Sequence, residues 1–182
     1  MIKTRKELKE YIKLDRQNNF YHKHSLELKY LKILRHAEYH FNLNHRIRYA
    51  IWHLKLHIIS NNYLTYIPLN VFDSGLSISH LGCIYISNST VGGKNVRISQ
   101  NVTIGATNGN NESPKIGNNC FVGPNSCLIG DITIANDVCI AAGCVVTKSI
   151  LENGTTWGGV PAKKISDNSS HANIPVFING NK

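Results

Sequence analysis

Two features that mark large classes of protein are missing from this chain. No apolar run reaches eighteen residues, so we expect no integral membrane segment. The first sixteen residues carry charges throughout and lack the apolar stretch of a secretion signal, which predicts a cytoplasmic protein. At 182 residues the chain has room for one domain and at most a small appendage.

The number of cysteines in the chain is odd. Five cysteines cannot all pair within one chain, and a cytoplasmic protein keeps its thiols reduced. Cys120 and Cys144 fall at positions where the repeat described below needs a small apolar side chain. We therefore interpret the cysteines as packing residues.

Acidic residues are also few, and the resulting charge is uneven. The chain has 20 Lys and Arg against 11 Asp and Glu, a net charge of +9. Residues 1–62 hold 13 of these basic residues and 5 of the acidic ones, a net of +8. Because no nucleic-acid-binding motif accompanies the charge, we expect a solvated helical surface and no nucleic-acid partner. Attraction of an anionic substrate or cofactor is the other open explanation.

The second half of the chain has an aliphatic residue at every sixth position, with one gap between Ile104 and Ile116. The rungs of this ladder are Ile98, Ile104, Ile116, Val122, Leu128, Ile134, Ile140 and Val146. Small or medium residues recur between the rungs at Cys120, Ser126, Ile132, Val138, Cys144 and Ile150. A six-residue period is typical of a parallel β-helix, in which each hexad supplies one short strand and a turn. Upstream, Ile86 and Val91 lead the repeat, with a predicted register slip of one residue between Val91 and Ile98.

Residues 1–62 have helical patterns instead. Thr4 and Glu7 form a capping box that begins a helix, and Ser25 begins a second one. The apolar stripe of the second helix is Leu26, Tyr30, Ile33, Leu34, Ala37 and Phe41, and a third helix is marked by Ile47, Ala50, Ile51, Leu54 and Ile58. We expect these stripes to pack on the first coil of the β-helix or on a neighbouring subunit, capping the solenoid.

The chain therefore divides into an N-terminal helical segment (1–62), a mainly β domain (63–165) and a polar tail (166–182). We expect the tail to be poorly ordered or loosely docked. One rung is missing between Ile104 and Ile116, where residues 105–114 have the composition of an exposed loop. We expect this loop to protrude from a corner of the coil on the functional face.

Histidine placement singles out one candidate catalytic residue. Seven histidines lie in the helical segment and His171 lies in the tail, which leaves His80 within the repeats. Imidazole exchanges protons near neutral pH, so a general base is favoured over a surface histidine that fills a turn.

The hexapeptide array, His80, the loop before Pro114 and the closing segment 158–162 together resemble the hexapeptide-repeat acyltransferases. The resemblance covers residues 65–165 and is strongest to the serine-acetyltransferase-like branch, which includes capsule and colanic-acid O-acetyltransferases. It implies a left-handed β-helix assembled as a homotrimer, with acetyl-CoA bound between subunits and no metal required. His80 would take the proton from an acceptor hydroxyl that attacks the thioester.

The resemblance also implies which residues contact the cofactor, at the positions where this sequence matches the motifs of the family. These residues are Gly105, Asn125, Ala142, Thr147, Lys148, Lys163 and Lys164. Lys148 is the strongest single candidate, and the two later lysines match positions near the adenosine phosphate.

The chain departs from serine acetyltransferases where those enzymes hold their substrate. They place one aspartate directly before the histidine and another fifteen residues upstream, where this chain has Ser79 and Thr65. Glu112 and Ser113 replace an Arg-His pair. A site without those charges grips a zwitterion poorly, so we predict an O-acetyltransferase that modifies a saccharide hydroxyl, of a capsular or other surface polysaccharide or its precursor.

Several alternatives stay open. The nearest is serine O-acetyltransferase of cysteine biosynthesis. A β-helical carbonic anhydrase would need several histidines on one zinc, and the repeats offer His80 only. A nucleophilic Cys83 is disfavoured because we expect its apolar surroundings to bury the thiol. A non-catalytic binding or scaffold β-helix has no need of His80 or Lys148. Asp73 is the candidate to orient His80.

Overall fold

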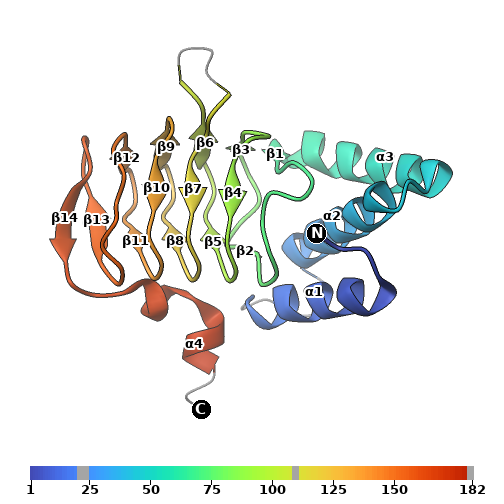
Figure 1. The fold of residues 1–182 in the computed structure, drawn as a ribbon, viewed down its shortest axis with the longest axis horizontal. Coiled ribbons are helices and arrows are strands. Elements are labelled where there is room, and N and C mark those ends of the chain that lie inside the picture. The colour runs from blue at the N-terminus through green and yellow to red at the C-terminus, as the bar shows by residue number, and fades with distance from the viewer. Residues whose placement is uncertain (20–24, 108–110, 180–182) are drawn as a thin grey trace.

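Three helices precede a parallel β-helix in the computed structural model, which describes residues 1–19, 25–107 and 111–179 (Figure 1). The helices are α1 (Arg5–Gln17), α2 (Leu26–Asn42) and α3 (Arg46–Tyr63). None of the helices in the described ranges is long and apolar enough to cross a membrane.

The strands are two to four residues long and lie on three faces of a prism. Face A holds β1 (Thr65–Tyr66), β3 (Ile84–Ile86), β6 (Thr103–Gly105), β9 (Cys127–Ile129) and β12 (Val145–Val146). Face B holds β4 (Val91–Gly92), β7 (Lys115–Ile116) and β10 (Thr133–Ile134). Face C holds β2 (Ser77–Ile78), β5 (Arg97–Ile98), β8 (Phe121–Val122), β11 (Cys139–Ile140), β13 (Thr156–Gly158) and β14 (Lys163–Ser166). Among these described strands only β13 and β14 pair antiparallel, and the predicted left-handed parallel β-helix is confirmed.

The six-residue ladder forms the core of this prism. Every rung from Ile116 to Val146 is at most 4% exposed, and so are the six intervening positions. The interpretation of Cys120 and Cys144 as packing residues is confirmed, and burial raises the pKa of the Cys120 thiol to about 12. The local pattern was therefore sufficient to identify these inward positions.

The predicted register slip at Val91 is wrong. Val91 points outward, and Gly92 takes the inward position beside Ile116. A Cβ on Gly92 would lie 2.0 Å from Cδ1 of Phe72, so the Phe72 ring fills the place of the missing side chain. The six-residue period therefore runs without a slip through Gly92 to Ile98.

The helix starts follow the predicted caps. The Glu7 backbone N–H donates to Thr4 Oγ1 at 3.1 Å, and the Thr4 N–H donates to Glu7 Oε2 at 2.9 Å. The Ser25 hydroxyl accepts the N–H of Leu28. In α2 the middle of the predicted stripe is buried, whereas its ends, Leu26 and Phe41, are exposed.

The apolar stripe predicted for the third helix does not pack on the first coil. Its aliphatic residues are exposed, and α3 packs on α2 through another face that includes Trp52, Leu56 and Ile59. Both faces of α3 are apolar, so the pattern alone did not reveal which one turns inward.

The tail is docked, contrary to expectation, over its described residues. It forms η1 (Ser170–Asn173) and α4 (Pro175–Asn179), and Ile174 between them is fully buried. His171 Nε2 lies 2.8 Å from Asp137 Oδ1, and the Val176 N–H donates to Asn18 Oδ1 at 3.2 Å. The tail thereby links the later coils to the end of α1, as Figure 1 shows. Residues 180–182 lie outside the described part.

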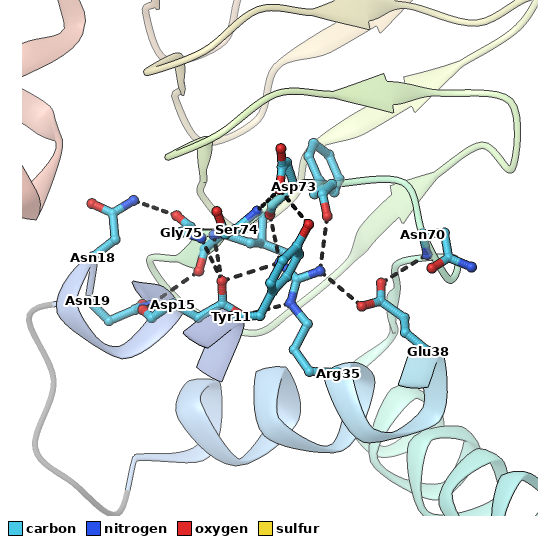
Figure 2. A network of polar contacts seen from close by, with 12 residues as sticks. Tyr11, Asp15, Asn18, Asn19, Arg35, Glu38, Asn70, Asp73, Ser74 and Gly75 are labelled. Atoms are coloured by element: carbon cyan, nitrogen blue, oxygen red, sulfur yellow. Dashed lines mark hydrogen bonds and ion pairs between the residues drawn. The ribbon is translucent and has the colours of Figure 1, made fainter. Parts of the chain in front are cut away.

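A buried ion pair joins the helices to the first coil (Figure 2). Arg35 Nε lies 2.7 Å from Asp15 Oδ2, and Arg35 also donates to the carbonyls of Phe72 and Asp73 at 2.9 and 2.7 Å. Burial raises the pKa of the Asp15 carboxyl, although the charge of Arg35 opposes this shift. A charge in such a place is tolerated because its partners hold it from several sides.

The same network forms hydrogen bonds with the backbone of the segment that leads into β2. Asp15 Oδ1 accepts the N–H groups of Gly75 and Leu76 at 2.8 and 2.9 Å. Asn18 Nδ2 donates to the Gly75 carbonyl at 2.6 Å, and Glu38 Oε1 accepts the N–H of Asn70 at 2.9 Å. At this end of the solenoid no further coil is present to form these hydrogen bonds. The helices therefore provide the partners for the backbone groups of the first coil.

Removing one member of this network should leave a buried charge without its partner. We expect Arg35→Ala to lower the free energy of unfolding by about 3–5 kcal/mol, measured by urea denaturation. The matched control is Lys115→Ala, which breaks the exposed pair with Asp131 and should lower the free energy of unfolding far less. Equal losses in the two variants would contradict a clamping role for Arg35.

Candidate functional site

His80 lies on the turn between β2 and β3, at the edge where face C meets face A. The preceding residue, Ser79, is buried and fixes the start of the turn. Its N–H donates to the Ile98 carbonyl at 2.8 Å, and its hydroxyl accepts a hydrogen bond from Arg97 Nε at 2.9 Å. The His80 side chain itself is exposed at the surface.

The other end of the turn is fixed by Thr65. The Gly82 N–H donates to Thr65 Oγ1 at 3.1 Å, and the Thr65 hydroxyl donates to the Tyr63 carbonyl at the same distance. Thr65 and Ser79 stand where serine acetyltransferases are expected to have aspartates. Here both hydroxyls support the backbone that carries His80.

Asp73 was predicted to orient His80, and the structure gives its carboxylate other partners (Figure 2). Asp73 Oδ1 accepts the hydroxyl of Tyr11 at 2.6 Å and the N–H of Ser74 at 2.6 Å. Burial acts to raise the pKa of this carboxyl, but the hydrogen bonds from Tyr11 and Ser74 outweigh it and lower the pKa. Asp73 is thus tied to α1 through Tyr11.

Two of the predicted cofactor residues share the edge that carries His80. The turns of successive coils stack there: the N–H of Asn101 donates to the Gly82 carbonyl at 2.9 Å, and Asn101 Nδ2 donates to Asn125 Oδ1 at 2.9 Å. The following turn contains Ala142, which is exposed like Asn125. Asn125 has a φ of 61°, a left-handed conformation that asparagine adopts more readily than most residues.

Three other predicted cofactor residues lie on the opposite edge of face A. Gly105 ends β6, and its carbonyl accepts the N–H of Gly130 at 2.9 Å. Thr147 and Lys148 follow β12 and are exposed. The segment between β6 and β7 rises from this edge (Figure 1), while the tip of the predicted loop, residues 108–110, is outside the described residues.

The two remaining lysines lie on β14, at the far end of face C. Lys164 Nζ is 2.6 Å from Glu152 Oε1 and 2.6 Å from Asp167 Oδ1, and these hydrogen bonds raise its pKa. Lys163 is exposed. Because Lys164 is already held by two carboxylates, Lys163 is the better candidate to meet a phosphate group.

The predicted site residues therefore fall on two edges of one prism and at its far end. Face A separates the edge of His80 from the edge of Lys148. Within the described ranges, no group of three or more His, Cys, Asp or Glu side chains is placed to hold a metal ion.

Cys83 corrects one expectation from the sequence. The side chain is exposed rather than buried, and the residue has a φ of 49°. The apolar run from Leu81 to Ile86 is broken by the turn at Gly82 before β3 begins, so Cys83 points away from the core.

Comparison with known proteins agrees with this geometry. Residues 113–148 match the model of the family described as bacterial transferase hexapeptide (six repeats). This segment carries the hexapeptide repeat of bacterial transferases. It is 37% identical over 107 residues to serine acetyltransferase 3, mitochondrial, of Arabidopsis thaliana, and 31% identical over 147 residues to serine acetyltransferase 1, chloroplastic, of the same plant.

These alignments include much of this chain but less of the relatives. They cover 56% and 73% of this chain and 27% and 46% of the two plant proteins. A solved structure of serine acetyltransferase from Brucella abortus, in complex with coenzyme A, superposes with a TM-score of 0.72 at 23% identity. That superposition covers 90% of this chain and 68% of the other. At this identity the likeness establishes the shared fold.

The exposure of Cys83 can be checked by thiol labelling. Of the five cysteines in this hexapeptide-repeat protein, we expect Cys83 to react fastest with Ellman's reagent under native conditions, because Cys120 and Cys144 are buried. Cys83→Ser should remove the fast phase, whereas Cys120→Ser should leave it in place. A fast phase that survives Cys83→Ser would show that another thiol is accessible.

Proposed function

We propose that the chain is an acetyl-CoA-dependent O-acetyltransferase with His80 as its general base. The observation that carries the proposal is the exposed His80 on a turn anchored at both ends, at an edge shared with Asn125 and Ala142. A base must be held in place to gain from proximity, and this backbone is held by Ser79 and Thr65. The match to a transferase family supports the same reading.

The proposed reaction moves one proton and one acyl group. The His80 imidazole takes the proton of an acceptor hydroxyl while the alcohol oxygen attacks the thioester carbonyl of acetyl-CoA. The tetrahedral intermediate collapses by breaking the carbon–sulfur bond, and the imidazolium returns the proton to the departing thiolate. Backbone N–H groups near Gly105 are proposed to stabilise the oxyanion. Asp73 is given no part in this step, since its carboxylate accepts the hydroxyl of Tyr11.

L-Serine is the first acceptor to test. The relatives named above are serine acetyltransferases, which supports the serine alternative more than the saccharide hypothesis. A saccharide hydroxyl remains the second candidate because of Ser79 and Thr65. Both hydroxyls are engaged in supporting the His80 turn, so the carboxylates expected around an amino-acid substrate are missing at these positions.

We propose a homotrimer with the cofactor bound between copies. The support is that the candidate residues divide between two edges, so an edge of one copy has to meet an edge of another to complete a site. The outward row of face A contains no charged residue: Tyr66, Tyr85, Thr103, Cys127 and Val145 lie in register across it. An uncharged face of this kind suits burial against a second copy.

His80→Ala should lower kcat by about 10²–10⁴-fold, because a positioned base contributes about that factor. Thiol release from acetyl-CoA measures the rate, and calorimetry should show that coenzyme A still binds. His53→Ala is the matched control, since His53 is an exposed histidine of α3. A rate unchanged by His80→Ala would exclude the proposed base.

The acceptor can be identified by measuring acetyl-CoA consumption with L-serine, simple sugars and capsule fragments in parallel. We expect L-serine to give the highest kcat/KM, because the relatives named above are serine acetyltransferases. Turnover with a saccharide and none with L-serine would establish the second candidate. Absence of both turnover and coenzyme A binding would favour a scaffold protein.

A further inference from the structure

α3 carries four aliphatic side chains on its outer surface. These residues, here called the outer ridge, are Ile47, Ile51, Leu54 and Ile58, which are 80%, 50%, 59% and 51% exposed. At 3.6 residues per turn their spacing of four, three and four places them within about 60° of one another around the helix axis. They point away from Leu56 and Ile59, which pack into the core. A contiguous apolar ridge of this kind marks an interaction surface.

Cations flank the outer ridge on both sides. Helical geometry places Arg48 and Lys55 about a quarter-turn to one side of it and Arg46 about a quarter-turn to the other. α3 contains no aspartate or glutamate. The groove between α3 and the neighbouring α2 is lined by Lys55 together with Lys29 and Lys32 of α2. The partner of this surface must therefore offer both an apolar layer and negative charge.

A second copy of the chain meets these requirements poorly. Pairing two outer ridges would bring the arginines and lysines of one α3 against those of the other, and such like-charge contacts are costly. Of the five exposed carboxylates in the described residues, Asp131 pairs with Lys115, and Glu152 and Asp167 pair with Lys164. Glu10 and Glu112 are then the only ones left to meet the cations of a second copy.

We propose that the outer ridge docks on the surface of an anionic lipid bilayer. α3 lies parallel to the membrane plane, with its four aliphatic side chains entering the boundary between head groups and acyl chains. The cations on the two sides of the helix reach the phosphates of the head groups; they are Arg46, Arg48 and Lys55. This docking is peripheral and does not depend on the proposed acetyl transfer. It accounts for the exposed ridge and for the net charge of +8 in residues 1–62.

Vesicle co-sedimentation tests the proposal with the full chain. We expect the protein to sediment with vesicles of phosphatidylcholine mixed with phosphatidylglycerol, less with phosphatidylcholine alone, and less as salt is raised. The double variant Ile51→Ser with Leu54→Ser should lower the partition coefficient by roughly tenfold or more, because it removes apolar area from the bilayer. Arg48→Gln with Lys55→Gln should lower it by roughly tenfold and flatten the salt dependence.

The matched control is Leu151→Ser, which removes another exposed aliphatic side chain at the opposite end of the molecule and should leave vesicle binding unchanged. Circular dichroism confirms that each variant is folded. The proposal is overturned if the parent protein binds neither vesicle, or if the ridge variant binds as tightly as the parent. It is also overturned if the parent self-associates without lipid and the ridge variant does not, since the ridge would then be an interface between copies.

Discussion

The stacking of inward side chains in the prism is the constraint on which the rest of this structure depends. Each coil must fill every inward position with an apolar or small side chain, because the strands are too short to be stable without the coil above and below. Where a side chain is missing, another fills the space, as Phe72 does beside Gly92. This requirement holds the register of the strands and therefore the position of every turn.

Chemistry in such a fold has to be placed on the turns and edges, since the interior is filled. His80 projects from one edge, and the hydrogen bonds of Ser79 and Thr65 keep its turn in register with the next coil. The same stacking brings Asn125 to that edge, while Lys148 is carried to the other. One coil can therefore present functional groups on separate edges, and assembly decides which of them meet.

The helices cover the open end of the solenoid. The first coil leaves backbone groups that would otherwise be unpaired, and the Asp15–Arg35 pair with its neighbours satisfies them. A buried ion pair is a costly way to do this, and it stays in place because each charge has several partners. The result is a rigid join between the helices and the turn before β2, while α3 keeps an apolar face directed outward.

The sequence by itself determined the features that rest on local periodicity and local hydrogen bonds. The rungs from Ile116 to Val146, the caps at Thr4 and Ser25, and the place of His80 in the repeats were all predictable, because each depends on residues a few positions apart. Only the tertiary structure decided that Phe72 replaces a side chain at Gly92, that Asp73 binds Tyr11, that Cys83 is exposed, and that the outer ridge faces outward. The first three outcomes depend on contacts between segments distant in the chain, and the last depends on which of two apolar helix faces packs inward. A periodic pattern in the sequence contains no information on either.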